Sequence, residues 1–147
     1  MSFPALVDEH FAFLVNKYGF VRLSPPECQA GEMVTFRKEP VSILIGWYKG
    51  EIDIDFCVDL DFAAHHPIFR PYVSRTFRLE ELALKQDADA YAAWAARSHQ
   101  GNYITTLEEA GDFLHYSAAV MKRSVKPVLQ GDMTMLEEVT KQRRRMI

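Results

Sequence analysis

The sequence of 147 residues predicts a single α+β domain, with an N-terminal helix, an antiparallel meander of about four to five strands, and C-terminal helices packed on one face. Three observations predict this class. Strand-like segments follow one another through short connections between residues 20 and 60, and short connections favour antiparallel neighbours. Helix-favouring, alanine-rich sequence follows residue 80, and no linker or repeat divides residues 1–147 into two domains. Strands and helices segregated along a chain are typical of α+β proteins.

The N-terminal segment predicts one helix over residues 3–18. Its apolar side chains recur at helical spacing, at Phe3, Leu6, Val7, Phe11, Leu14 and Tyr18. Ser2 can cap the start of this helix, and Gly19 suits its end. Residues 20–23 then predict a short strand, which Pro25 and Pro26 end because proline cannot donate to a strand ladder.

Three further strands are predicted over residues 32–38, 41–48 and 51–60. Residues 41–48 are apolar at both sets of alternating positions, so we expect this strand at the centre of the sheet with both faces covered. Lys49 and Gly50 form a two-residue turn signal. Residues 51–60 alternate, with one apolar set and one polar set: Ile52, Ile54, Phe56 and Val58 on one face, and Asp53, Asp55, Cys57 and Asp59 on the other.

The second half of the chain predicts helices after one more strand. Residues 61–71 predict an irregular connection or a helical turn, and residues 72–79 an edge strand, because Pro71 precedes them. Alanine-rich helices are expected over residues 81–85 and 88–97. Thr106 with Glu109 forms a capping box that opens a long helix, which Pro127 should stop or kink. Gly131 and Asp132 predict a turn before a last helix over residues 133–145.

The long helix carries an apolar seam with alternating intervals of four and three residues: Leu107, Gly111, Leu114, Ala118, Met121, Val125 and Val128. The small residues Gly111 and Ala118 favour close packing against the sheet or a neighbouring helix. The alternative is a coiled-coil seam between two copies of the chain. The sequence therefore leaves monomer or homodimer undecided.

Composition and charge exclude several classes of protein. With 48% hydrophobic and 25% charged residues the chain is an ordinary globular protein, and its net charge of −3 gives no general attraction to nucleic acid. The basic residues of 141–145 are interpreted as a solvated helix end, with binding to nucleic acid or an anionic membrane as the alternative.

No apolar stretch approaches a membrane span and no signal peptide is visible, so a cytoplasmic protein is expected. Cys57 is expected to be a reduced, packed thiol.

One cluster contains metal-ligating residue types, namely Asp59, Asp61, His65 and His66. Its spacing matches no known metal motif, and adjacent histidines point in different directions on a regular element. The cluster is therefore interpreted as a solvated strand end and loop, although the sequence does not tell whether it ever binds a metal. No metal, other cofactor or catalytic residue is predicted, because no nucleophile, zinc or phosphate-loop motif occurs. The lack of these motifs in the sequence favours a protein that is not an enzyme.

The acidic row formed by Asp53, Asp55 and Asp59 is the more informative feature. Carboxylates about 7 Å apart on one sheet face repel one another unless they are solvated or meet basic groups. Three interpretations follow: a solvated surface or one paired with local Arg and Lys, a docking face for a basic protein partner, or a paired-carboxylate acid–base site. The candidate partner-binding residues are Trp47, Tyr48, Glu51, Asp53, Asp55 and Asp59.

The segment Phe11–Phe20, followed by Val34-Thr35-Phe36 and Ile52-Asp53-Ile54-Asp55-Phe56, resembles a group of small uncharacterised bacterial proteins. Some of these are similar to immunity proteins of polymorphic-toxin and contact-dependent inhibition systems. The resemblance covers roughly the first 60 residues and transfers no functional residue. It implies a first helix that ends in a Tyr-Gly-Phe step, an antiparallel sheet, and a small non-enzymatic protein that binds a partner protein. The alternative is a small-ligand-binding protein or enzyme with a pocket between the sheet and the C-terminal helices.

Overall fold

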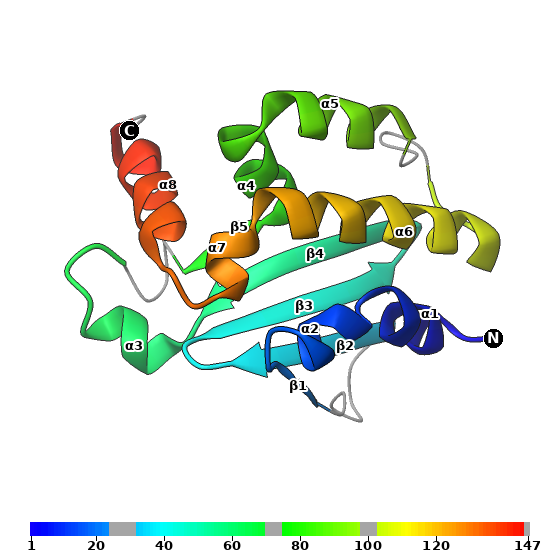
Figure 1. Cartoon of the computed structure of the whole chain (residues 1–147), viewed down its shortest axis with the longest axis horizontal. Coiled ribbons are helices and arrows are strands. Elements are labelled where there is room, and N and C mark those ends of the chain that lie inside the picture. The colour runs from blue at the N-terminus through cyan, green and yellow to red at the C-terminus, as the bar shows by residue number, and fades with distance from the viewer. Residues whose placement is uncertain (24–31, 70–74, 98–102, 146–147) are drawn as a thin grey trace.

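The computed structural model describes residues 1–23, 32–69, 75–97 and 103–145, and it shows an α+β fold. Five strands form one sheet in the order in which they occur along the chain: β1 (Val21–Leu23), β2 (Glu32–Lys38), β3 (Val41–Tyr48), β4 (Glu51–Val58) and β5 (Thr76–Arg78). Every neighbouring pair is antiparallel. Helices α1, α6 and α7 lie on the same side of this sheet (Figure 1). The predicted helix, meander and C-terminal helices are confirmed.

The N-terminal helix is interrupted where the sequence predicts one continuous helix. Its first part, α1 (Phe3–His10), is capped by Ser2, whose Oγ accepts a hydrogen bond from the Ala5 amide at 3.3 Å. At Phe11 the backbone leaves the helical region, with φ −111° and ψ 19°, and α2 (Ala12–Asn16) follows. The Phe11 side chain at this break is fully buried. Gly19 ends the helical segment at φ 77°, a conformation that glycine adopts without strain.

Strands β2 and β3 have the predicted bounds, and β4 ends at Val58 rather than at residue 60. Lys49 and Gly50 both adopt positive φ, as a tight two-residue turn between β3 and β4 requires. The expectation that β3 is central is confirmed, but the expectation that both its faces are covered is wrong. Its alternate residues are half-buried or exposed, because the helical layer covers one face of the sheet.

Six helices follow β4 in the described part of the chain: α3 (Leu60–Ala64), and after β5 α4 (Leu79–Gln86), α5 (Ala88–Arg97), α6 (Leu107–Ser124), α7 (Lys126–Leu129) and α8 (Thr134–Arg145). The capping box is confirmed, because Thr106 Oγ1 accepts a hydrogen bond from the Glu109 amide at 3.1 Å. Helix α6 ends before Pro127, which lies in the first turn of α7. The turn before α8 is also confirmed, with Asp132 accepting a hydrogen bond from the Thr134 amide at 2.9 Å. Only part of the strand predicted over residues 72–79 can be compared, since residues 70–74 lie outside the described residues.

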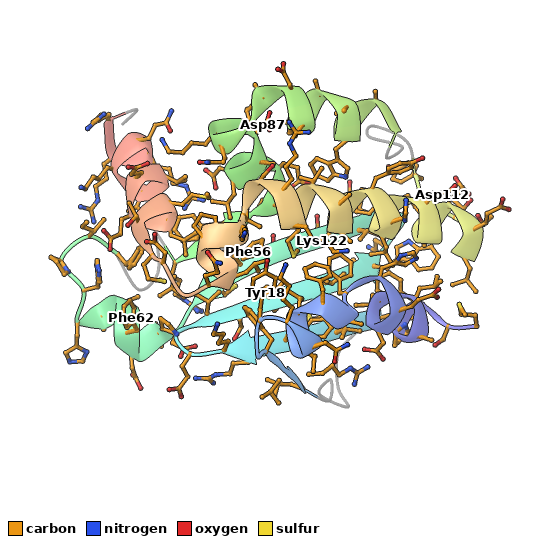
Figure 2. The ribbon with its side chains drawn as sticks, viewed as in Figure 1. Tyr18, Phe56, Phe62, Asp87, Asp112 and Lys122 are labelled. Atoms are coloured by element: carbon orange, nitrogen blue, oxygen red, sulfur yellow. The ribbon has the colours of Figure 1, made fainter. Side chains whose placement is uncertain are left out.

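The core lies between the sheet and the helices. Five residues of the predicted seam are buried within the chain, namely Leu114, Ala118, Met121, Val125 and Val128, whereas Leu107 is 41% exposed. The seam therefore packs within the chain, as the first alternative expected. Phe56 of β4 and Tyr18, labelled in Figure 2, belong to the same core. No helix among the described residues is long and apolar enough to cross a membrane.

Candidate functional site

The two faces of the sheet differ in burial. On the covered face, the side chains of Val34, Phe36, Ile43, Ile45, Ile54 and Phe56 are buried. We call the opposite side of the sheet the open face. The residues on it are Val21, Leu23, Met33, Thr35, Arg37, Ser42, Leu44, Gly46, Tyr48, Glu51, Asp53, Asp55, Cys57, Thr76 and Arg78. Each of them is exposed or intermediate in accessibility. In the described part of the chain, no helix buries this face.

Apolar and aromatic side chains lie on the open face. Val21 is 60% exposed, Leu23 37% and Tyr48 53%. Leu44, in the central strand, is opposite Thr35 of β2 and Asp55 of β4. Apolar side chains that gather into one exposed patch are typical of surfaces that bind another molecule.

One end of the open face is acidic. Arg78 of β5 lies directly opposite Asp55 of β4. Its guanidinium pairs with Asp53, and its Nε lies 4.0 Å from Asp55 and 3.7 Å from Glu80, the second residue of α4. Three carboxylates therefore share one guanidinium. We call Asp53, Asp55, Arg78 and Glu80 the acidic cluster.

This arginine does not fully compensate the cluster. Burial raises the pKa of Asp55, the neighbouring Asp53 raises it further, and Arg78 offsets only part of the shift. Burial also raises the pKa of Glu80, although hydrogen bonding to its own backbone amide and Arg78 act in the opposite direction. Glu80 Oε2 is buried without a hydrogen-bond partner among the described residues. An additional cation at this place would stabilise the ionised carboxylates.

The other end of the acidic row is paired locally. Arg37 of β2 donates to Asp59 at 2.7 Å and to Glu39 at 3.3 Å. For Asp59, pairing with a local arginine is therefore what the structure shows. Between the two ends, Cys57 is half-buried, with its Sγ 3.7 Å from Thr76 Oγ1, and burial raises the pKa of its thiol.

The structure brings four of the six predicted partner-binding residues together on the open face: Tyr48, Glu51, Asp53 and Asp55. Asp59 lies just beyond the end of β4, beside Arg37. Trp47 lies on the covered face, where its ring centroid is 5.5 Å from that of Phe3 and its Nε1 donates to the Ile104 carbonyl at 3.1 Å. Its polar edge is thus already bonded within the chain.

Sequence reasoning missed Arg78 and Glu80 as members of this site. Arg78 falls within the strand predicted over residues 72–79, but only the pairing of β5 with β4 brings it opposite Asp55. Leu44 belongs to the strand that the sequence predicts to be covered on both faces. The signal that could have found it is its position between Thr35 and Asp55 in the register of the meander.

The side chains of the predicted metal-ligating cluster have separate partners. His65 Nδ1 lies 2.9 Å from the Asp61 carbonyl oxygen, and His66 Nε2 lies 3.4 Å from a carboxylate oxygen of Glu137. Asp59 pairs with Arg37. Among the described residues, no group of three or more His, Cys, Asp or Glu side chains could hold a metal ion.

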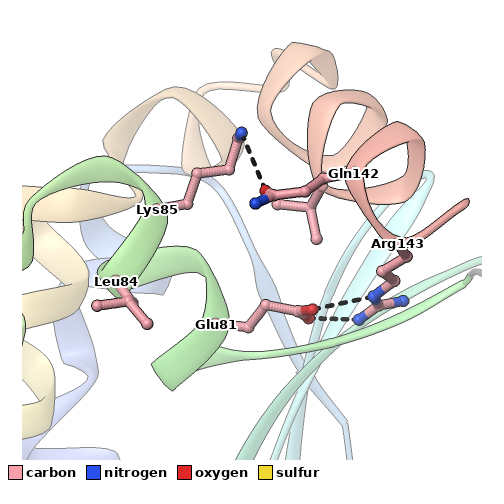
Figure 3. Close-up of a pocket in the computed structure, with 6 residues that line it drawn as sticks. Glu81, Leu84, Lys85, Gln142 and Arg143 are labelled. Carbon is pink, nitrogen blue, oxygen red and sulfur yellow. Dashed lines mark hydrogen bonds and ion pairs between the residues drawn. The ribbon is translucent and has the colours of Figure 1, made fainter. Parts of the chain in front are cut away.

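A groove between α4 and α8 borders the acidic cluster. Figure 3 shows Glu81 of α4 facing Arg143 of α8, and Lys85 facing Gln142. Arg143 Nε donates to Glu81 Oε2 at 2.9 Å, and Lys85 Nζ lies 3.4 Å from Gln142 Oε1. The groove has a volume of about 410 Å³, and Leu84 and Val139 also line it.

Comparison of the chain with protein-family models, with curated proteins and with solved structures finds no match. Inference about function therefore depends on the surfaces described above.

Proposed function

We propose that this chain is a small non-enzymatic binding protein that recognises a partner protein with a basic surface through its open face. One observation carries the proposal: the face of the sheet that no described helix buries combines exposed apolar side chains with carboxylates that a single arginine leaves undercompensated.

The apolar side chains of the open face favour binding through the hydrophobic effect. Burying Leu23, Leu44 and Tyr48 against a partner would remove apolar area from water, at about 25 cal/mol for each Å². Tyrosine is enriched among the residues that dominate protein interfaces, and Tyr48 is 53% exposed. These residues also lie on paired strands, so little backbone freedom would be lost on binding.

The acidic cluster supplies specificity. A lysine or arginine of the partner placed beside Asp53 and Asp55 would favour the ionised form of Asp55, whose pKa burial now raises. Opposite charges on two partners also accelerate their encounter, and this acceleration falls as salt is added. The resemblance to toxin-immunity proteins adds a toxin as the proposed kind of partner.

The test starts with co-purification from the native host, with mass spectrometry to identify the partner. Binding of the purified partner is then measured by surface plasmon resonance for the wild type and for Asp53→Asn/Asp55→Asn. We expect this variant to associate about tenfold more slowly, with a weaker dependence on salt, because steering charge is lost. The matched control is Glu108→Gln/Asp112→Asn on α6, which removes equal charge from exposed positions outside the open face.

The control should associate at the wild-type rate. If Asp53→Asn/Asp55→Asn binds the partner with the wild-type rate and salt dependence, the open face is not the recognition surface. A partner that binds equally well after Tyr48→Ser and Leu44→Ser would contradict the apolar part of the proposal.

A further inference from the structure

The groove between α4 and α8, shown in Figure 3, has a further hollow at each end. Toward the end of α8, Lys85 and Gln142 also line a hollow of about 450 Å³ with Glu138, Lys141 and Arg145. Toward the sheet, Glu81 and Arg143 line another with Arg78 and Glu80. Neighbouring hollows share lining residues and therefore adjoin one another, and we call the three together the α4–α8 groove. It begins at the acidic cluster of the open face.

The charge of this groove changes along its length. Near the sheet, Glu81 is held by Arg143, which also donates to the Thr76 carbonyl at 2.9 Å and lies 4.5 Å from the centroid of the Phe77 ring. The charges of Glu81 and Arg143 are therefore already paired within the chain. Farther along, the lining consists of Lys85, Lys141 and Arg145 with one carboxylate, that of Glu138.

The three cations at the far end have no ion-pair partner in the part of the chain that the structure describes. Lys85, Lys141 and Arg145 are exposed, and no described carboxylate lies within 4.0 Å of their nitrogens. Leu84, the neighbour of Lys85 on α4, is 53% exposed at the same groove. The groove thus offers an apolar contact beside several cations.

We propose that the α4–α8 groove binds an acidic segment of a partner protein, with an apolar side chain on Leu84 and carboxylates against Lys85, Lys141 and Arg145. Charge complementarity identifies this occupant. The inference rests on the proposed function in taking the partner to be a protein, and it adds a second contact surface of opposite charge.

The lining favours a polypeptide over a nucleic acid or a membrane. Glu80, Glu81 and Glu138 line the α4–α8 groove and would repel a continuous row of phosphates. An acidic peptide can place carboxylates only where cations lie and can present an apolar side chain between them. Recognition of acidic motifs by clusters of basic side chains is also a recurring way to bind peptide segments.

The experiment uses the full chain and an array of synthetic peptides of about 12 residues, roughly the length of the neighbouring α8 (12 residues). The array varies the number of Asp and Glu residues and the presence of Leu or Phe beside them. Dissociation constants of the best peptides are measured by fluorescence anisotropy. We expect the wild type to select acidic peptides that contain Leu or Phe.

Charge is tested with Lys141→Glu/Arg145→Glu, which should weaken the best peptide by about tenfold or more. The matched control is Lys17→Glu/Lys126→Glu, an equal charge change at exposed lysines that do not line the groove. The apolar contact is tested with Leu84→Ser, expected to weaken binding about threefold. Its control is Val15→Ser, at an exposed valine of α2. All four variants replace exposed side chains, and thermal unfolding verifies that each is folded.

Absence of a preference for acidic peptides would overturn the proposal. So would equal binding by Lys141→Glu/Arg145→Glu and its control. Phosphatidylserine vesicles and a single-stranded oligonucleotide are tested in parallel, and binding of either in place of the peptides, lost in the groove variant, would also overturn it. Asp53→Asn/Asp55→Asn should bind the peptides as the wild type does, so failure of the open-face proposal and failure of this one give different results.

Discussion

The two faces of the sheet place the same strands in different environments. Ile43 and Leu44 are neighbours in β3, yet Ile43 is fully buried under the helical layer while Leu44 is half-buried on the open face. In β4, Phe56 is buried, whereas Asp55 beside it meets Arg78 and water. The covered face therefore supplies most of the free energy of folding, and residues of the open face can serve another purpose at little cost in stability.

The largest expected effect contrasts adjacent positions of β3. Ile43→Ala should lower the free energy of unfolding by about 2–5 kcal/mol, because it removes buried methyl groups and leaves a cavity. Leu44→Ala should lower it by less than about 1 kcal/mol, since the side chain already contacts water. Urea denaturation of both variants measures the difference. Equal losses would show that the open face is buried as deeply as the covered one.

A smaller effect is expected from Arg78→Ala, which leaves Asp53, Asp55 and Glu80 without their shared guanidinium. The free energy of unfolding should fall by about 1 kcal/mol at pH 7, because three carboxylates then repel one another. Burial already raises the pKa values of Asp55 and Glu80, so protonation favours the folded state. The deficit should therefore shrink as the pH falls toward about 4, near the ordinary carboxyl pKa values. A deficit that is constant between pH 7 and pH 4 would contradict an electrostatic cause.

The smallest effect is expected from Asp55→Asn. The folded state raises the pKa of Asp55, so its contribution to stability is present when it is protonated and is lost as the pH rises through the folded-state pKa. A neutral amide should therefore stabilise the protein at pH 7 by up to about 0.5 kcal/mol, and the gain should vanish at low pH. Thermal unfolding at both pH values measures it, with Asp112→Asn on α6 as the control. A loss of stability at pH 7 would show that the pairing of Asp55 with Arg78 outweighs its burial.

Much of the fold could be predicted from local sequence. The bounds of β2 and β3 follow from alternation and from the turn at Lys49 and Gly50, and α6 follows from the capping box at Thr106. These signals lie within a few residues of the structure that they determine. The break at Phe11 could not be predicted in this way, because Phe11 continues the apolar period of the helix and no glycine or proline lies beside it.

The candidate site was predicted less completely. Alternation along β4 placed Asp53 and Asp55 on one face, but it could not show which face lacks a helix, since β3 is apolar on both sides. Arg78 is 23 positions from Asp55, and the register between β4 and β5 decides their pairing. Lys141 and Arg145 were interpreted from the sequence as part of a solvated helix end. Their position beside Lys85 could not be predicted, because it depends on how α4 and α8 pack.

The position of Trp47 has a practical consequence for spectroscopy. The chain has two tryptophans, and both point into the interior: Trp47 beside Phe3, and Trp94, whose Nε1 donates to Ser117 Oγ at 3.0 Å. Intrinsic indole emission should therefore report on unfolding while staying insensitive to molecules that dock on the opposite side of the sheet. Tyr48→Trp would place a fluorophore on that side, giving one optical signal for folding and a separate one for complex formation.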